Sequence, residues 1–140
     1  MKLFADANIL VSVFNKEYPL FPFTARILSL AGRDNYEIYT SPVCLAIAFY
    51  FAEKKHGTSL AKEKTALLCR HISIAENTRD GVQKVLINPA IHDFEDGLEY
   101  YAAKASQCHC IITENQEDFY FSEIEVLDSR EFCRKYLPGK

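Results

Sequence analysis

The sequence has no apolar run long enough to form a membrane-spanning helix, which requires about 20 residues. Its longest apolar stretch, Val43 to Ala52, ends at Glu53. The N-terminus carries an acid at Asp6, where a signal peptide would still be apolar. We therefore expect a soluble, cytoplasmic protein that makes no contact with a membrane.

An excess of positive charge is also missing. The 140 residues include 16 Lys and Arg against 19 Asp and Glu, which gives a formal charge of −3. Tight, non-specific binding of nucleic acid depends on clustered Lys and Arg, so the charge balance argues against this class of protein. The hydrophobic share of 49% and the charged share of 25% exclude a disordered chain. The length predicts a single domain spanning residues 1–140.

Cysteine is too sparse for a disulfide scaffold. The five cysteines are an odd number and are spread along the chain, whereas secreted disulfide-rich domains use cysteine densely and in pairs. Cys108-His109-Cys110 resembles half of a metal site, but no second pair of Cys or His residues has the spacing of a zinc site. We interpret these cysteines as buried thiols of a strand in a reducing compartment.

Short apolar segments alternate with longer amphipathic ones along the chain. The short segments predict strands and the long ones predict helices. The predicted strands cover residues 3–5, 36–40, 72–75, 109–113 and 125–127, and the predicted helices cover residues 8–15, 23–31, 59–71, 79–87 and 93–106, with two more that begin at Pro42 and after a Ser129 cap. This alternation predicts an α/β fold of three layers, in which helices flank both faces of a central, mostly parallel sheet of about five strands.

Acidic and amide side chains follow the predicted strands at their carboxyl ends, where parallel sheets bind ligands. Asp6 ends the first strand, and Asn115 and Asp118 follow the fourth. Asp93 and Asp96 open a helix and, being three residues apart, lie on one face of it. Oxygen donors of this kind gather around hard cations such as Mg²⁺. Each residue also has a purely structural interpretation: Asp6 as the end of a strand, Asp93 and Asp96 as helix-capping residues, and Asn115 and Asp118 as loop or turn residues. None is specific alone.

Three segments in this order resemble the PIN domain family: Leu3 to Asn8 (LFADAN), Asp93 to Glu99 (DFEDGLE) and Ile111 to Asp118 (IITENQED). Within that family the chain looks most like the branch related to the VapC-type toxins of toxin–antitoxin systems. The resemblance covers nearly the whole chain and implies an endoribonuclease that depends on Mg²⁺ or Mn²⁺. Its substrate would be single-stranded or structured RNA, and its protein partners would be a cognate antitoxin and a second copy of the chain.

The resemblance also implies a set of site residues. Asp6, Asp93 and Asp96 would bind the metal, and together with Asn115 they would form the catalytic site. Asp118 is a further candidate for the same site. A phospho-receiver domain, which shares the parallel sheet and an acidic pocket, would need an adjacent pair of acids after the first strand, where Asp6 stands alone.

Two positions depart from the family pattern. Ile47, six residues after Ser41, stands where relatives carry an acid or an asparagine, and its side chain cannot bind a cation. Asn115 stands where many relatives carry an acid. Glu95 is an alternative carboxylate, although its place on the helix predicts that it points to the side. We expect Ile47 to face the acidic pocket, the alternative being that it packs in the core.

The lost ligands leave a second function open. A degenerate PIN domain, which binds protein or RNA without cleaving it, is compatible with the residues at positions 47 and 115. The run Phe49-Tyr50-Phe51 cannot place all three rings against one core, and exposed aromatic rings of this kind are typical of protein interfaces. By resemblance, such an interface would serve a homodimer or an antitoxin peptide.

Overall fold

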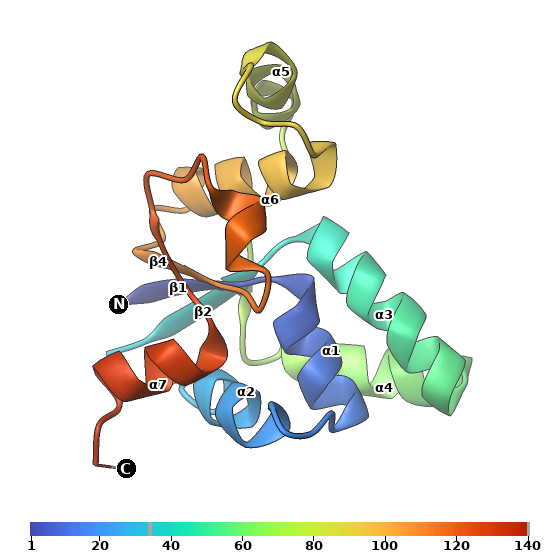
Figure 1. Ribbon diagram of the computed structural model, residues 1–140. Coiled ribbons are helices and arrows are strands. Elements are labelled where there is room, and N and C mark those ends of the chain that lie inside the picture. Colours follow the sequence, from blue (N-terminus) through green and yellow to red (C-terminus); the bar gives the residue numbers. More distant parts are fainter. Residues whose placement is uncertain (34, 140) are drawn as a thin grey trace.

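The computed structural model describes residues 1–33 and 35–139, and within them five parallel strands form one sheet in the order β3-β2-β1-β4-β5 (Figure 1). The strands are β1 (Lys2–Ala5), β2 (Glu37–Thr40), β3 (Ser73–Ile74), β4 (Cys110–Ile112) and β5 (Glu125–Leu127). Because every strand runs in the same direction, all five carboxyl ends lie at one edge. The predicted α/β fold with a central parallel sheet is confirmed.

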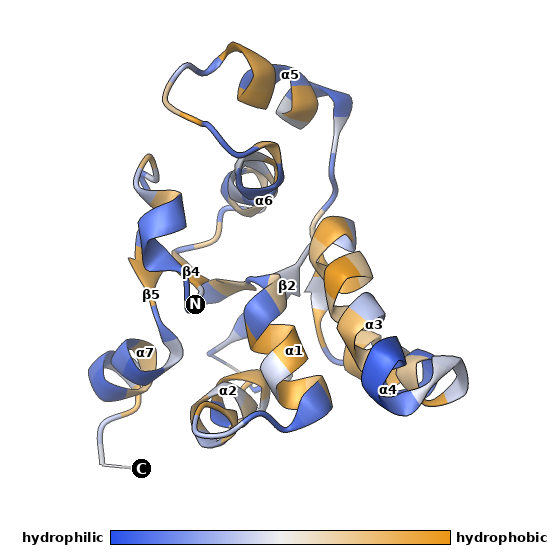
Figure 2. Cartoon of the chain, turned by 45° about the vertical axis from the view of Figure 1, so that its right-hand side comes forward, coloured by the Kyte–Doolittle hydropathy of each residue, from blue (hydrophilic) through white to orange (hydrophobic). Residues whose placement is uncertain are grey.

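Helices connect successive strands and cover both faces of the sheet. In the described part of the chain they are α1 (Ala7–Asn15), α2 (Phe21–Leu28), α3 (Pro42–His56), α4 (Thr58–Cys69), α5 (Arg79–Ile87), α6 (Phe94–Ala105), the short 3₁₀ helix η1 (Gln116–Phe119) and α7 (Ser129–Tyr136). α6 lies on one side of the sheet and α1, α2 and α7 lie on the other, while α3 packs beside α1 (Figures 1 and 2). None of the described helices combines the length and the apolar character that a membrane span requires.

The two central strands form the most deeply buried part of the core. Leu3 and Phe4 of β1 have no exposed surface, and the same holds for all three residues of β4. Strands covered on both faces are continuous apolar runs rather than alternating ones, which is why residues 3–5 and 110–112 carry no charge. Each large apolar side chain buried in this way contributes about 1.5–3 kcal/mol to folding.

Helix caps place polar side chains at the carboxyl edge of the sheet. Asp6 caps α1 directly after β1, and Ser41 caps α3 directly after β2. Asp93 caps α6 by accepting a hydrogen bond from the backbone N–H of Asp96 at 3.0 Å. The capping interpretation of Asp93 is therefore correct, while Asp6, which was expected at most to end its strand, also caps a helix. The caps orient both carboxylates at this edge.

The ends of α2 differ from the predicted ones. The helix begins at Phe21 rather than at residue 23, because Pro22 occupies its first turn, where the missing N–H is not needed. It ends at Leu28 rather than at Ala31. Beyond that point the N–H of Leu30 bonds to the carbonyl of Ile27 at 3.0 Å, a tighter turn that is common at helix ends.

The N-cap of α7 also differs from the predicted one, which was Ser129. Asp128 caps the helix, and Ser129 is the first helical residue. The carboxylate of Asp128 accepts the N–H of Glu131 at 2.8 Å, and the Glu131 carboxylate accepts the N–H of Asp128 at 3.0 Å. This reciprocal capping box satisfies two backbone donors, whereas a serine cap at position 129 would satisfy one.

The five cysteines, all within the described part, are free thiols. Cys108 and Cys110 are buried, and burial raises the pKa of each thiol to about 12. The Nδ1 atom of the intervening His109 accepts a hydrogen bond from the backbone N–H of Lys2 at 3.0 Å, so this nitrogen is already bonded to β1. The interpretation of Cys108 and Cys110 as buried thiols is confirmed, although only Cys110 lies in β4 and Cys108 precedes the strand.

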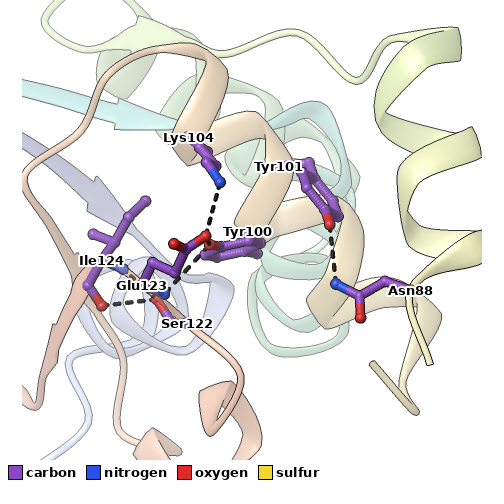
Figure 3. A network of polar contacts seen from close by, with 7 residues as sticks. All are labelled: Asn88, Tyr100, Tyr101, Lys104, Ser122, Glu123 and Ile124. Carbon is purple, nitrogen blue, oxygen red and sulfur yellow. Dashed lines mark hydrogen bonds and ion pairs between the residues drawn. The ribbon is translucent and has the colours of Figure 1, made fainter. Parts of the chain in front are cut away.

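α5 stands apart from the sheet and rests on α6 (Figure 1). A glycine allows the close approach, because a Cβ atom at Gly97 of α6 would lie 2.6 Å from Cγ1 of Val85 and 2.9 Å from Cγ2 of Ile91. The side-chain amide of Asn88, just beyond α5, donates to the hydroxyl of Tyr101 at 3.1 Å (Figure 3). The position of α5 therefore depends on a side-chain-free patch of α6.

The opposite flank of α6 is fastened to the segment before β5. Lys104 and the hydroxyl of Tyr100 both donate to the carboxylate of Glu123, at 3.0 and 3.4 Å (Figure 3). Together with the contact of α5, these bonds hold α6 from two sides. The first turn of α6, which carries Asp93 and Asp96, is thereby fixed relative to the sheet.

The Gly97→Ala substitution should lower the free energy of unfolding by about 1–3 kcal/mol, the usual cost of overpacking. Alanine stabilises a helix by about 1 kcal/mol relative to glycine. A loss of stability in the Gly97→Ala protein would therefore show that the contact with α5 outweighs helix propensity. Gly81→Ala is the matched control, since its nearest neighbour would lie at 3.4 Å. Urea denaturation measures both; a Gly97→Ala protein as stable as the Gly81→Ala protein would contradict the packing argument.

Candidate functional site

A cleft of about 450 Å³ opens at the carboxyl edge of the sheet, between α1, α3 and the start of α6. Among the described residues, no lysine or arginine lines it, whereas its acidic lining residues are Asp6, Glu17, Asp93, Glu95, Asp96, Glu99 and Asp118. The other lining residues are Ala7, Asn8, Val11, Ile47, Phe51 and Asn115. All four residues proposed for the catalytic site from sequence therefore line one cleft.

The carboxylate of Asp6 lies at the floor of this cleft and is buried. Its Oδ1 atom accepts the backbone N–H of Ala7 at 2.6 Å, and its Oδ2 atom accepts the hydroxyl of Thr113 at 2.7 Å and the side-chain amide of Asn8 at 3.3 Å. Thr113 follows β4, the strand paired with β1. Two donors from α1 and one from the residue that follows β4 thus fix the orientation of this carboxylate.

The first turn of α6 supplies three more acids. Asp93 and Glu95 are exposed, whereas Asp96 is half-buried. Asp96 lies near Asp6 in the cleft, and Asp93 is held by the N–H bond that caps the helix. Glu95 lines the cleft as well, contrary to the expectation that it would point to the side. The helix therefore presents a broader acidic face than the spacing of Asp93 and Asp96 predicts.

Glu99 is a cleft residue that the sequence analysis missed. It lies one helical turn after Asp96, and only 1% of its surface is exposed. The thiol of Cys44 on α3 donates to its Oε1 atom at 3.0 Å. Its spacing of three residues from Asp96 was the available signal, since residues so spaced share a helix face.

Asn115 and Asp118 lie at the mouth of the cleft, and both are exposed. The N–H of Asn115 donates to the hydroxyl of Thr113 at 3.1 Å, which ties the mouth to the residue that also holds Asp6. Asp118 belongs to η1, directly after β4. Both residues thus line the cleft while remaining exposed to solvent.

One wall of the cleft is apolar and comes from α1 and α3. It consists of Val11, Ile47 and Phe51. Ile47 is half-buried and also packs against the core, so the expectation that it faces the acidic pocket is confirmed, and the alternative of core packing is correct in part. This wall supplies no ligand atom, and it lowers the polarity around the neighbouring carboxylates.

Burial and mutual repulsion raise the pKa values of several of these acids. Burial, with the neighbouring charges of Asp93, Asp6, Asp118 and Glu95, raises the pKa of Asp96 to about 7. Burial, with the charges of Asp93 and Asp6, raises the pKa of Glu95 above its ordinary value. For Glu99, burial and the hydrogen bond with Asp6 raise the pKa strongly, and burial raises that of the Cys44 thiol to about 11.

The donor atoms of the cleft fit a divalent cation. Ligand-type atoms of Asp6, Cys44 and Glu99 lie within 4.8 Å of one another, and so do those of Glu95, Asp96 and Glu99. Nearly all of them are carboxylate oxygens, which hard divalent cations prefer. A cation would also offset the repulsion that raises the pKa values of these acids.

The stability of the metal-free protein should fall as the pH rises through neutrality. The pKa of Asp96 is about 7 in the folded protein against a reference value of 3.8, so between these values the folded state binds more protons and its free energy of unfolding declines with pH. Asp96→Asn removes this titration. In EDTA, the melting temperature of the variant should fall less steeply with pH across that window than that of the wild type. Parallel profiles for the two proteins would contradict the assignment.

Comparisons with known proteins agree with this geometry. The family model described as PIN domain matches residues 2–117. Over 96% of its length the chain is 26% identical to ribonuclease VapC1 of Aquifex aeolicus (strain VF5), of which 95% is covered.

Solved structures show the same fold at low sequence identity. The VapBC2 structure from Rickettsia felis, bound to a promoter DNA fragment, has a TM-score of 0.66 and 18% identity, and the match covers 91% of this chain and 98% of that one. VapC20 of Mycobacterium tuberculosis, a sarcin–ricin loop cleaving toxin, has a TM-score of 0.63 and 13% identity, covering 78% and 86%. The family match, the parallel sheet and the acidic cleft at its carboxyl edge lead to one conclusion: this chain belongs to the PIN domain family.

Proposed function

We propose that the chain is a PIN-type endoribonuclease that depends on Mg²⁺ or Mn²⁺ and acts as the toxin of a toxin–antitoxin pair. The observation that carries the proposal is the cleft at the sheet edge, where Asp6, Asp93 and Asp96 come together with no lysine or arginine among the described lining residues. The similarity to a ribonuclease over nearly the whole chain supports the same activity.

Asp6, Asp93 and Asp96 would hold the ion, with Asn115 beside them at the mouth of the cleft. A bound divalent ion lowers the pKa of water and neutralises charge that develops on a phosphodiester. Asp6 is preorganised for this role, because its three donors hold the carboxylate in place before any ligand arrives. Asn115 can donate a hydrogen bond to a phosphate oxygen from its amide without adding to the repulsion.

RNA, single-stranded or structured, is the proposed substrate, since its phosphates need the cation to enter so acidic a cleft. A cognate antitoxin is the proposed protein partner, because the VapBC2 structure that shares this fold is a toxin–antitoxin complex bound to promoter DNA. Tyr50 and Phe51 of α3 are 54% and 44% exposed and would contribute to such an interface or to a homodimer. The proposed site of action is the cytoplasm.

Cleavage of a fluorescent single-stranded RNA tests the nuclease proposal. With Mn²⁺, the Asp6→Asn and Asp96→Asn variants should lose about 100-fold or more of the activity, because even outer partners of metal ligands contribute about 10- to 100-fold. EDTA should abolish cleavage. Glu17→Gln is the matched control, since it removes one exposed carboxylate from the cleft rim and should leave the rate nearly unchanged.

The alternative, a degenerate PIN domain, has its own support in the apolar side chain of Ile47 and the uncharged Asn115. It predicts RNA or protein binding without cleavage. A wild-type protein that cleaves no RNA with either ion but binds RNA in a gel-shift assay would contradict the nuclease and favour this alternative.

Substituting Ile47 by Asn should strengthen Mn²⁺ binding and raise the cleavage rate. The half-buried side chain lies on the cleft wall, so an amide oxygen there adds a ligand next to the carboxylates. Ile47→Val is the control for the lost packing, with an expected cost of about 0.5–1.5 kcal/mol. Calorimetry and thermal melts with and without Mn²⁺ provide the comparison. A large loss of stability that Mn²⁺ does not restore would mean that Ile47 serves the core alone.

A further inference from the structure

Glu99 is a fully buried acid that neither the helix caps nor the strand ends account for. It belongs to the second turn of α6, and its carboxyl group hydrogen-bonds to the Cys44 thiol, a weak donor, and to Asp6. No lysine or arginine of the described chain lines the cleft in which it lies. A buried carboxylate without a cationic partner is costly, so its presence there requires an explanation.

The position of Glu99 is central in the cleft. Two sets of ligand-type atoms lie within 4.8 Å of one another, one made of Asp6, Cys44 and Glu99 and the other of Glu95, Asp96 and Glu99. Glu99 is the residue common to both. The Glu99 carboxylate therefore lies between Asp6, at the end of β1, and the acids Glu95 and Asp96 in the first turn of α6.

We propose that Glu99 is a direct ligand of the divalent ion, together with Asp6 and Asp96. This inference rests on the proposed metal-dependent function and deepens it. The helix α3 presents only Ile47, Phe51 and the thiol of Cys44 toward this region, so it offers the ion no carboxylate. Glu99 supplies the missing oxygen ligand from α6.

The assignment gives the buried acid a counter-charge. A hard divalent ion takes carboxylate oxygens at 2.0–2.6 Å, and Glu99 offers carboxylate oxygens within 4.8 Å of those of Asp6 in one set and of Asp96 in the other. The Cys44 thiol donates a hydrogen bond to Oε1 of Glu99 at 3.0 Å and so orients the Glu99 carboxylate.

The competing role for Glu99 is structural: a neutral carboxyl group that hydrogen-bonds to Asp6. Glutamine separates the two roles, because it keeps the size and the neutral donor but has lost the carboxylate. If Glu99 is a ligand, Glu99→Gln weakens metal binding. If it is a neutral partner of Asp6, the same substitution leaves metal binding unchanged.

The test is Mn²⁺ binding to the purified full-length protein, measured by calorimetry and by electron paramagnetic resonance of free Mn²⁺. We expect Glu99→Gln to bind Mn²⁺ about tenfold or more weakly than wild type, and to lose most of the rise in melting temperature that Mn²⁺ gives. Glu17→Gln, at the exposed rim of the same cleft, controls for the general loss of negative charge and should bind as wild type.

Glu99→Asp keeps the charge and shortens the reach, so it should bind Mn²⁺ with an affinity between those of wild type and Glu99→Gln. Glu99→Asp also tests the assignment if the Glu99→Gln protein does not fold. Wild-type affinity in either folded variant would overturn the assignment of Glu99 as a ligand.

The Asp6→Asn variant separates failure of this inference from failure of the proposed function. If Asp6→Asn loses Mn²⁺ binding while Glu99→Gln keeps it, the metal site stands and only the role of Glu99 falls. If the wild-type protein binds neither Mn²⁺ nor Mg²⁺, both proposals are overturned together.

Discussion

The geometry of the cleft depends on the hydrogen bonds that hold the buried carboxylate of Asp6. One donor comes from the backbone of α1, one from the hydroxyl of Thr113 after β4 and one from Asn8. These bonds join the ends of two paired strands, whose register matches Phe4 with Ile111 and Ala5 with Ile112. A slip of either strand would leave a buried charge without its donors, so the same contacts that orient the acid also fix the centre of the sheet.

The repulsion among the acids of the cleft lowers the stability of the folded protein. Acids from β1, α6 and η1 meet in a space with one apolar wall, and the pKa values of Asp96, Glu95 and Glu99 are raised as a result. The fold tolerates this repulsion because the apolar strands β1 and β4 lie directly behind it, fully buried. Local conflict of this kind, placed against a well-packed core, is typical of functional sites.

The sequence predicts much of this arrangement, because the rules behind it are local or topological. Apolar runs identify the strands, and a parallel sheet brings their carboxyl ends together, which places Asp6, Asp96 and Asn115 in one cleft although they are far apart in the chain. Glu99 was missed although its spacing from Asp96 places both residues on one helix face. How deeply each position of that face is buried depends on how α6 packs on the sheet and on α5, and spacing along the helix does not reveal this.

The caps show a similar limit at shorter range. Asp128 and Ser129 are adjacent and both suit the start of a helix, so composition does not decide between them. The choice depends on the side chain of Glu131, which completes a capping box only with Asp128. The start of α2 likewise depends on whether Pro22 ends a turn or opens a helix, and both positions suit proline.

Helices of the described chain begin at the carboxyl edge of the sheet, among them α1 after Asp6, α3 after Ser41, α6 after Asp93 and α7 after Asp128. The peptide dipoles of a helix add up to roughly half a positive elementary charge at its N-terminus. The parallel topology that collects carboxylates at this edge therefore also directs positive helix ends toward it. The backbone thus offsets part of the negative charge of a cleft whose described lining holds no lysine or arginine.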